Sequence, residues 1–290
     1  MPSARPPSVR LIHGDARHLD PIPSSSVHLV VTSPPYPMIP QWDALFARLG
    51  ATDYDAMHAV LGAAWRECHR VLVPGGLLAI NIGDALRAGP HGFQLWPNHA
   101  ETLVRAAAVG FVPLPYVLWK KPFNKPNAFL GSGFLPPNAY VTLDCEFILP
   151  FRKGRLRRLP PHDPARTESR FSRVERDRWF SQVWEDVRGA PQRSARGGRS
   201  GAFPPAIPER LVRMFSLVGD TVLDPFAGTG TTVWAAAALG RNAIGVEWDD
   251  AAYLELTRSS RSRARSPTEG APDVRAPPRS PGGGSARPRD

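Results

Sequence analysis

The segment from Thr221 to Trp248 constrains the fold of this chain more than any other part of the sequence. Its residue pattern predicts a strand over 221–224, a glycine-containing turn, a helix over 231–239 and a second strand over 243–247. This order is a βαβ unit, and such units build parallel sheets that helices cover on both faces. The sequence therefore predicts an α/β domain.

Strand and helix patterns also alternate along the chain before this unit. Short runs rich in β-branched and other apolar residues predict strands over 27–32, 77–82 and 116–120, and within 141–151. Apolar residues at helical spacing predict helices over 54–71 and 100–108. The turn residues Pro74-Gly75-Gly76 are expected to precede the strand at 77. We expect a mostly parallel, doubly wound sheet.

Positive charge is concentrated in one internal segment and in the C-terminal tail. The chain carries 36 Lys and Arg against 26 Asp and Glu, and residues 151–200 alone hold 14 of the basic and 6 of the acidic residues. Clustered arginine is typical of proteins that bind the phosphate backbone of nucleic acids. The alternative is a bias toward arginine throughout the chain. Residues 259–290 are mostly Ser, Arg, Pro and Gly, and they predict a disordered basic tail, as residues 1–8 predict a disordered N-terminus.

Several classes of protein are not indicated by the sequence. It contains no run of eighteen apolar residues and no apolar region of a signal peptide, so a membrane partner is not expected and the cytoplasm is the expected location. Cys68 and Cys145 share no short spacing with histidines. We therefore expect neither a metal site nor a disulfide.

The βαβ unit carries a pattern for binding a nucleoside. Asp224 ends its first strand, Gly228 and Gly230 form its turn, and Glu247 ends its second strand. A carboxylate at that position can accept two hydrogen bonds from a ribose diol. A dinucleotide site usually has a third glycine where this chain has Val233, and no phosphate-binding lysine follows the turn. The pattern favours S-adenosylmethionine (AdoMet), which has a ribose but no phosphate.

A second motif, Ser33-Pro34-Pro35-Tyr36, follows the predicted strand over 27–32. The two prolines fix φ near −65° and hold the neighbouring carbonyl groups in one orientation. The motif thus offers rigid hydrogen-bond acceptors beside an aromatic ring, which suits a planar base with an amino group. The alternative is a proline-rich turn with no ligand.

Ser33–Tyr36 followed far downstream by Asp224–Gly230 resembles the β-class amino-methyltransferases of bacterial modification systems, in which the catalytic motif precedes the AdoMet motif. Further matching segments lie at 11–17, 70–76, 119–125, 146–153 and 203–212. The resemblance implies a Rossmann-like AdoMet-dependent methyltransferase fold with permuted motif order, and a target base flipped out of the duplex. It also implies a catalytic half over 9–151, an AdoMet-binding half over 204–258 and, between them, a small target-recognition insert over 152–203.

The resemblance also assigns site residues, with AdoMet as the cofactor and no metal. The catalytic residues are Ser33, Pro34, Pro35 and Tyr36. The cofactor-binding residues are Asp15, Asp224, Phe226, Gly228, Gly230, Thr231 and Glu247. The clustered basic charge adds the expected DNA-binding residues Lys120, Lys121, Arg152, Lys153, Arg155, Arg157 and Arg158.

The type of target base depends on Ser33. Serine at this position resembles the N4-cytosine enzymes, whereas aspartate mostly accompanies N6-adenine methylation, so N4-cytosine is expected and N6-adenine is the alternative. A C5-cytosine enzyme needs a Pro-Cys nucleophile, which neither cysteine offers. Two other classes stay open, a non-catalytic DNA-binding protein on this fold and an RNA or small-molecule methyltransferase. The expected partners are double-stranded DNA, a second copy of the chain and a cognate restriction endonuclease, in a bacterial cytoplasm near the nucleoid.

Overall fold

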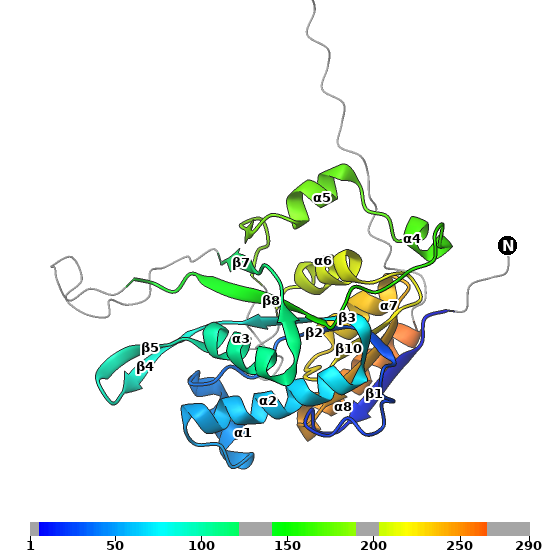
Figure 1. Cartoon of the computed structure of the whole chain (residues 1–290). Coiled ribbons are helices and arrows are strands. Elements are labelled where there is room, and N and C mark those ends of the chain that lie inside the picture. The colour runs from blue at the N-terminus through cyan, green and yellow to red at the C-terminus, as the bar shows by residue number, and fades with distance from the viewer. Residues whose placement is uncertain (1–5, 122–140, 190–202, 266–290) are drawn as a thin grey trace, which may run out of the picture.

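The centre of the molecule is a nine-stranded sheet in the order β1-β11-β10-β2-β3-β8-β7-β9, with β6 paired to β8 (Figure 1). The computed structural model describes residues 6–121, 141–189 and 203–265. The five strands from β1 to β3 in this order are parallel, and β8 runs antiparallel to its neighbours. The strands are β1 Val9–His13, β2 Val27–Thr32, β3 Leu72–Ile82, β6 Phe111–Pro113, β7 Val117–Lys120, β8 Cys145–Lys153, β9 Val183–Trp184, β10 Thr221–Asp224 and β11 Asn242–Glu247.

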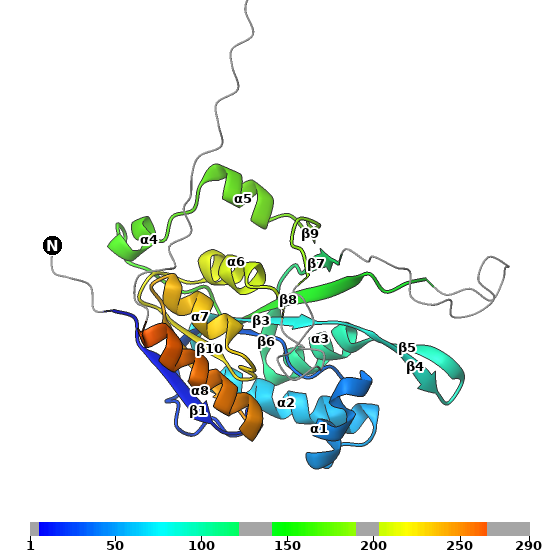
Figure 2. The same cartoon turned by 180° about the vertical axis from the view of Figure 1, so that it is seen from behind.

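Helices cover both faces of this sheet, as the sequence predicts (Figures 1 and 2). One layer holds α2 (Tyr54–Val71) and α3 (Asn98–Val109), and the other holds α6 (Ala206–Phe215), α7 (Thr231–Ala238) and α8 (Asp250–Arg265). The shorter elements are the 3-10 helix η1 Pro40–Trp42, α1 Asp43–Arg48, the hairpin strands β4 Ala85–Gly89 and β5 Gly92–Trp96, α4 Pro164–Glu168 and α5 Arg173–Trp179.

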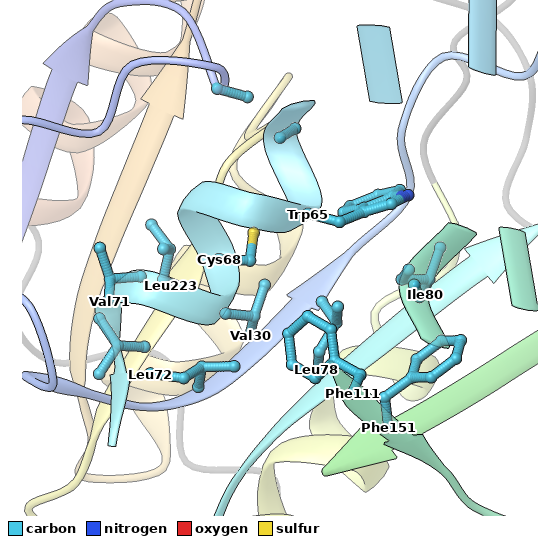
Figure 3. Close-up of a cluster of buried hydrophobic side chains, with 14 of the residues drawn as sticks. Val30, Trp65, Cys68, Val71, Leu72, Leu78, Ile80, Phe111, Phe151 and Leu223 are labelled. Carbon is cyan, nitrogen blue, oxygen red and sulfur yellow. The ribbon is translucent and has the colours of Figure 1, made fainter. Parts of the chain in front are cut away.

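The hydrophobic core lies between the sheet and the two helix layers. Figure 3 shows part of it, where Trp65 and Cys68 of α2 meet Leu78 and other side chains of the sheet. Strand β2 contributes Val30 to this cluster and Leu29 to the cluster on the opposite face. Since β2 is buried on both faces, its sequence is almost continuously apolar instead of alternating.

Most of the predicted elements are confirmed, and α2 and β10 have the predicted bounds. The turn expected at Pro74–Gly76 is wrong, because β3 already begins at Leu72 and runs through these residues. Gly75 has φ +81°, and an added Cβ would lie 2.3 Å from the backbone nitrogen of Arg157. Glycine is therefore needed where the chain that leaves β8 crosses β3. Strand β1 and the β4–β5 hairpin were not predicted.

Both ends of the described chain are more ordered than the sequence indicates. Ser8, expected to be disordered, donates from its amide nitrogen and its hydroxyl to the side-chain oxygen of Asn242 at 3.0 and 2.9 Å. Helix α8 continues to Arg265, so a tail beginning at 259 is a wrong boundary. The remaining predictions for the two termini concern residues 1–5 and 266–290, which lie outside the described residues.

Three further observations concern the described ranges. None of their helices is both long enough and apolar enough to cross a membrane. In the same ranges, His, Cys, Asp and Glu side chains form no group of three or more that could hold a metal ion. Cys68 and Cys145 are free thiols, the first buried and the second partly exposed.

Candidate active site

The two sequence motifs meet at the carboxyl ends of neighbouring strands. Strands β2 and β10 pair in parallel, so Ser33 and Asp224 leave the sheet at the same edge. The hydroxyl of Thr32 donates to Oδ1 of Asp224 at 2.7 Å, and both side chains are buried. A direct hydrogen bond therefore joins the residue before the Ser33–Tyr36 motif to the residue that opens the glycine turn.

Asp224 is a carboxyl group in an environment that disfavours its charge. It is 4% exposed, and its Oδ1 also accepts a hydrogen bond from the backbone nitrogen of Phe226 at 3.1 Å. Burial raises the pKa of Asp224 to about 6, although the hydrogen bonds from Thr32 and Phe226 oppose this shift. A group of this kind gains from a positively charged ligand.

Glu247 and the glycine turn form the neighbouring part of the site. The Glu247 carboxylate accepts hydrogen bonds from the backbone nitrogens of Gly228 at 2.7 Å and Asp249 at 2.9 Å, and burial raises its pKa. Gly228 has φ +52° and an added Cβ would meet no atom within 4 Å. Gly230 has φ +85°, but its Cβ would lie 2.5 Å from a Leu256 methyl carbon. The first glycine therefore faces open space, whereas the second allows close packing of the turn against α8.

A cavity of about 210 Å³ connects the two motifs. It is lined by Ser33, Trp42, Leu45, Phe203, Asp224, Phe226, Ala227, Gly228, Thr229, Thr231, Glu247, Ala252 and Glu255. Among these lining residues there are three carboxyl groups and no lysine or arginine. A phosphate-bearing nucleotide would be repelled, whereas AdoMet fits this lining, because it carries a sulfonium and an amino group and has aromatic neighbours for its adenine.

The structure brings most of the predicted cofactor residues together in this cavity. Asp224, Phe226, Gly228, Thr231 and Glu247 line it, and Ser33 of the second motif lines it as well. Gly230 lies in the same turn but does not line the cavity. Asp15 also does not line it, and its carboxylate is instead held by Arg17, with a shortest distance of 2.7 Å.

Five cavity residues lie outside the motifs that the sequence offered: Trp42 of η1, Leu45 of α1, Phe203, and Ala252 and Glu255 of α8. Their positions depend on how these elements fold back over the strand ends. The available signals were the position of Phe203 at the start of the matching segment 203–212 and the aromatic character of Trp42.

Tyr36 is held by a polar network that the sequence did not reveal. Its hydroxyl lies 3.0 Å from the Ser33 hydroxyl and donates to Oε2 of Glu146 at 3.1 Å. The amide nitrogen of Asn81 donates to the Tyr36 oxygen at 2.7 Å and to the same Glu146 oxygen at 2.6 Å. The Lys121 ammonium pairs with the other oxygen of Glu146. Asn81 was missed because it stands in an apolar strand without a motif of its own. Glu146 opens the matching segment 146–153, but the sequence assigned it no role.

Gly83 explains how this network fits against the sheet. An added Cβ there would lie 3.1 Å from Cγ of Glu146 and 3.2 Å from Cε2 of Tyr36. Both contacts are tighter than ordinary van der Waals packing. Glycine at this position therefore lets the Tyr36 ring and the Glu146 side chain pack against the end of β3.

The predicted DNA-binding residues are not gathered at one place. Lys120 is exposed on the side of the sheet where Ser33 and Asp224 follow the strand ends, which we call the catalytic edge. It pairs with Glu185 at 3.2 Å, and Lys121 forms an ion pair with Glu146. Because β8 runs antiparallel to β3, Phe147 lies beside Ile82 at the catalytic edge and Arg152 lies beside Leu77 toward the opposite edge. The segment that continues from Arg152 to Arg158 therefore leaves the sheet far from Ser33.

Two members of that segment have structural contacts instead of free charges. The Lys153 ammonium donates to the backbone oxygen of Leu72 at 2.7 Å, and Arg157 pairs with the buried Asp220 at 2.6 Å. The sequence predicts that these two residues contact DNA. Their positions in the structure do not favour such contacts. Arg155 and Arg158 are exposed and have no partner among the described residues.

The arginine-rich insert packs on α6. Arg210 of α6 pairs with Asp186 at 2.6 Å and stacks over the ring of Trp184, which is 1% exposed. Arg213 pairs with Glu175 of α5 in the same way and lies over Trp179. Two acidic residues of the insert are thus paired with arginines of α6, and Trp184 belongs to the hydrophobic core on this face of the sheet.

Comparisons with known proteins agree with this geometry. The model of the DNA methylase family N6_N4_Mtase matches residues 27–258. The type II methyltransferase M.MjaI of Methanocaldococcus jannaschii is 54% identical, over 83% of this chain and 87% of that protein. M.MthZI of Methanothermobacter thermautotrophicus is 44% identical, over 83% of this chain and 73% of that protein.

Solved structures show the same fold. A putative DNA modification methylase from Thermus thermophilus, complexed with S-adenosyl-L-methionine, has a TM-score of 0.71 and 40% identity over 89% of this chain and 96% of that one. The cytosine-N4-specific PvuII DNA methyltransferase has a TM-score of 0.63 at 18% identity, over 87% of this chain and 86% of that one. The predicted Rossmann-like fold of AdoMet-dependent DNA methyltransferases is confirmed, and the chain belongs to the DNA methylase family.

Proposed function

We propose that this protein methylates the N4 amino group of a cytosine at specific sites in duplex DNA, with AdoMet as methyl donor. One observation carries the proposal: a single cavity joins Ser33 to the glycine turn after β10 and to Glu247 at the end of β11. A base positioned at Ser33 is then next to a ligand positioned at Glu247. Membership of the DNA methylase family supports DNA as the substrate.

On the cofactor side, the chain binds and orients AdoMet. Glu247 is placed to accept hydrogen bonds from the ribose hydroxyls, and Asp224 and Glu255 provide negative charge for its cationic groups. Phe226 and Trp42 supply apolar and aromatic surface in the same cavity. When bound, AdoMet supplies a methyl group activated by its sulfonium.

On the base side, the rigid Ser33–Tyr36 segment receives a base that has left the duplex, because an amino group inside a base pair is out of reach. The Ser33 hydroxyl oxygen and the backbone carbonyl of Pro34 accept hydrogen bonds from its amino group, and the Tyr36 ring stacks on it. These acceptors would draw the amino hydrogens aside and leave the nitrogen lone pair free to take the methyl group. As the N–C bond forms, the S–C bond of AdoMet would break to leave S-adenosylhomocysteine, and one amino proton would be released to solvent. No covalent bond to the enzyme forms.

The choice of cytosine rests on Ser33. Most N6-adenine enzymes of the β-class, which this chain resembles, have aspartate at this position. Mass spectrometry of nucleosides from DNA methylated by the purified protein tests this choice directly. N4-methylcytosine is the expected product. N6-methyladenine as the product would overturn the assignment of cytosine but would still support a DNA methyltransferase. AdoMet binding without either product would support a non-catalytic protein.

Two sets of variants test the division of the site. Ser33→Ala and Tyr36→Ala should lose most of their turnover and keep AdoMet affinity, because both act on the base; the loss of one positioned group typically costs about 2.7–4 kcal/mol. Glu247→Ala should weaken AdoMet binding in calorimetry and leave non-specific DNA affinity unchanged. Loss of AdoMet binding in Tyr36→Ala would contradict this division.

We also propose that the insert over 152–203 reads the target site, mainly through its part near the catalytic edge. Strand β9 runs parallel to β7, so Arg188, which follows β9, leaves the sheet on the same side as Ser33. Arg188 is exposed. Single-molecule sequencing of DNA from cells that express Arg188→Ala should show a relaxed motif, and Arg155→Ala at the opposite edge should retain it. The opposite pattern would move the reading surface to residues 152–158.

A homodimer and a cognate restriction endonuclease also remain proposals, which follow only from the resemblance to modification systems. Sedimentation of the purified chain with and without target DNA tests the first. Duplex cleavage by the product of a neighbouring gene tests the second.

A further inference from the structure

The network behind Ser33 contains two hydroxyl groups whose directions are set by their neighbours. A tyrosine hydroxyl has one hydrogen to donate and can accept two hydrogen bonds. Burial, followed by the nearby charge of Glu146, raises the pKa of Tyr36 well above its usual value, so the phenol keeps its hydrogen. An ionised carboxylate can only accept, so the Tyr36 hydrogen must point to Glu146, at 3.1 Å.

The orientation of Asn81 follows from the same carboxylate. Its nitrogen lies 2.6 Å from Glu146, and an amide oxygen at that distance would be repelled. Asn81 therefore donates to the Tyr36 oxygen as well, at 2.7 Å. One lone pair of Tyr36 is then left, and it faces the Ser33 hydroxyl at 3.0 Å.

We infer that Glu146 acts through Tyr36 to make Ser33 a pure acceptor toward the target base, so that the site selects an amino group over a carbonyl. With the Tyr36 hydrogen committed to Glu146, only Ser33 can supply the hydrogen in the bond between the two hydroxyls. The Ser33 oxygen then presents lone pairs, and no hydrogen, to the base. This inference rests on the proposed function, since it takes Ser33 to contact the base.

A second observation points the same way. Oδ1 of Asn81 is buried, in a residue 1% exposed, and accepts no hydrogen bond within the described residues. The cluster as a whole therefore holds more acceptors than donors. Oδ1 of Asn81 is too buried to reach a base, so the match to a base is made at Ser33: an N–H group of the base meets its acceptor there, whereas a carbonyl oxygen would face an acceptor.

Because Lys121 pairs with Glu146, the side chain at position 146 must accept hydrogen bonds on two sides. Its ammonium pairs with one carboxylate oxygen while Asn81 and Tyr36 donate to the other. A glutamine has a single oxygen and cannot accept on both sides. In Glu146→Gln the oxygen is drawn to Lys121, and the amide hydrogens then face Asn81 and Tyr36, which frees the Tyr36 hydrogen to turn toward Ser33.

The test measures discrimination between an amino and a carbonyl group at the target position. Duplexes carry cytosine or uracil at that position, each opposite an abasic site so that unpairing costs the same for both. Binding is measured with S-adenosylhomocysteine present, and single-turnover methylation is measured with AdoMet. Wild type should bind cytosine at least about tenfold more tightly than uracil. If the product assay identifies adenine, then adenine and hypoxanthine replace the two bases.

Glu146→Gln and Tyr36→Phe should each reduce this ratio by about threefold or more and lower the methylation rate constant, with AdoMet affinity unchanged. Glu146→Asp should restore part of the ratio. Two matched controls should keep the wild-type ratio: Glu101→Gln, which alters a pair with Arg105 on α3, and Tyr54→Phe, whose hydroxyl has no partner within the described ranges.

A variant with slower methylation and an unchanged ratio would overturn the inference and reduce Glu146 to a structural support. An unchanged rate in both variants would overturn it as well. A wild-type protein that methylates neither cytosine nor adenine would instead overturn the proposed function, so the two failures are distinguishable.

Discussion

Replacing Asp224 with asparagine should stabilise the free protein above pH 6 and weaken its hold on AdoMet. The folded protein raises the pKa of this buried carboxyl group from an ordinary value of 3.8 to about 6. A difference of about two units corresponds to about 3 kcal/mol between the two protonation states. Since the folded pKa is the higher one, this stability is present below pH 4 and is lost as the pH rises through 6. Asparagine does not titrate and can still accept from Thr32 and Phe226.

Urea unfolding followed by tryptophan fluorescence, at several pH values between 5 and 8, measures the effect. The free energy of unfolding of Asp224→Asn minus that of wild type should be about half of its full value at pH 5 and rise to about 3 kcal/mol at pH 8. Titrating groups that do not interact with Asp224 cancel in this difference, whereas Glu247, whose charge raises the pKa of Asp224, cancels only in part. Thr32→Val, which removes the hydroxyl donor to Asp224, should lower the stability of wild type at pH 8 more than at pH 5.

The same carboxyl group makes AdoMet binding depend on pH. If the cofactor requires ionised Asp224, wild type should bind AdoMet about tenfold more weakly at pH 5 than at pH 8, and Asp224→Asn should lack this part of the dependence. Burial raises the pKa of Glu247 too, which adds a dependence of the same sign to both proteins. A stability difference that does not vary with pH, or an asparagine variant that is less stable at pH 8, would refute the reasoning.

Three further predictions follow from the positions of individual residues. In thermal denaturation, Gly228→Ala should cost about 1–2 kcal/mol of stability for its left-handed backbone, and Gly230→Ala should cost clearly more, because its Cβ would also meet side chains of α7 and α8. Arg157→Ala should lower stability by about 1–3 kcal/mol by removing the arginine that pairs with the buried Asp220, with the DNA target motif unchanged; a changed motif would restore Arg157 as a DNA contact. Truncation after Arg265 should retain the methylated motif and reduce the salt dependence of DNA affinity, and loss of the motif would show that the tail takes part in recognition.

The cofactor side of the site could be predicted from sequence because its parts are close along the chain. Asp224, Gly228 and Glu247 belong to one βαβ unit, whose geometry is fixed by the strand–turn–helix order. The unit also requires glycines that fit particular backbone angles, and these are visible as residue types. Local chemistry thus specified both the turn and the acid at the next strand end.

The DNA-binding residues were harder to predict, because the sequence shows charge but not its partners. Arg157 and Lys153 read as part of a basic cluster, yet the fold commits one to Asp220 and the other to a carbonyl of β3. The direction of β8 decides the rest. An antiparallel strand carries its end to the edge opposite the motif at Ser33, and no residue pattern states that direction.

The base side depends on contacts between distant strands, and for that reason its most informative residues were missed. Ser33 and Pro34 are visible as a motif, but the direction of the Ser33 hydroxyl is set by Glu146, which the antiparallel strand β8 brings to the end of β3. A motif search finds the groups that touch the base. The hydrogen bonds that these groups form in the folded protein decide whether they donate to the base or accept from it. The amino group of a base requires acceptors. The antiparallel strand β8 therefore brings together, through the Glu146 carboxylate, groups that lie far apart along the sequence.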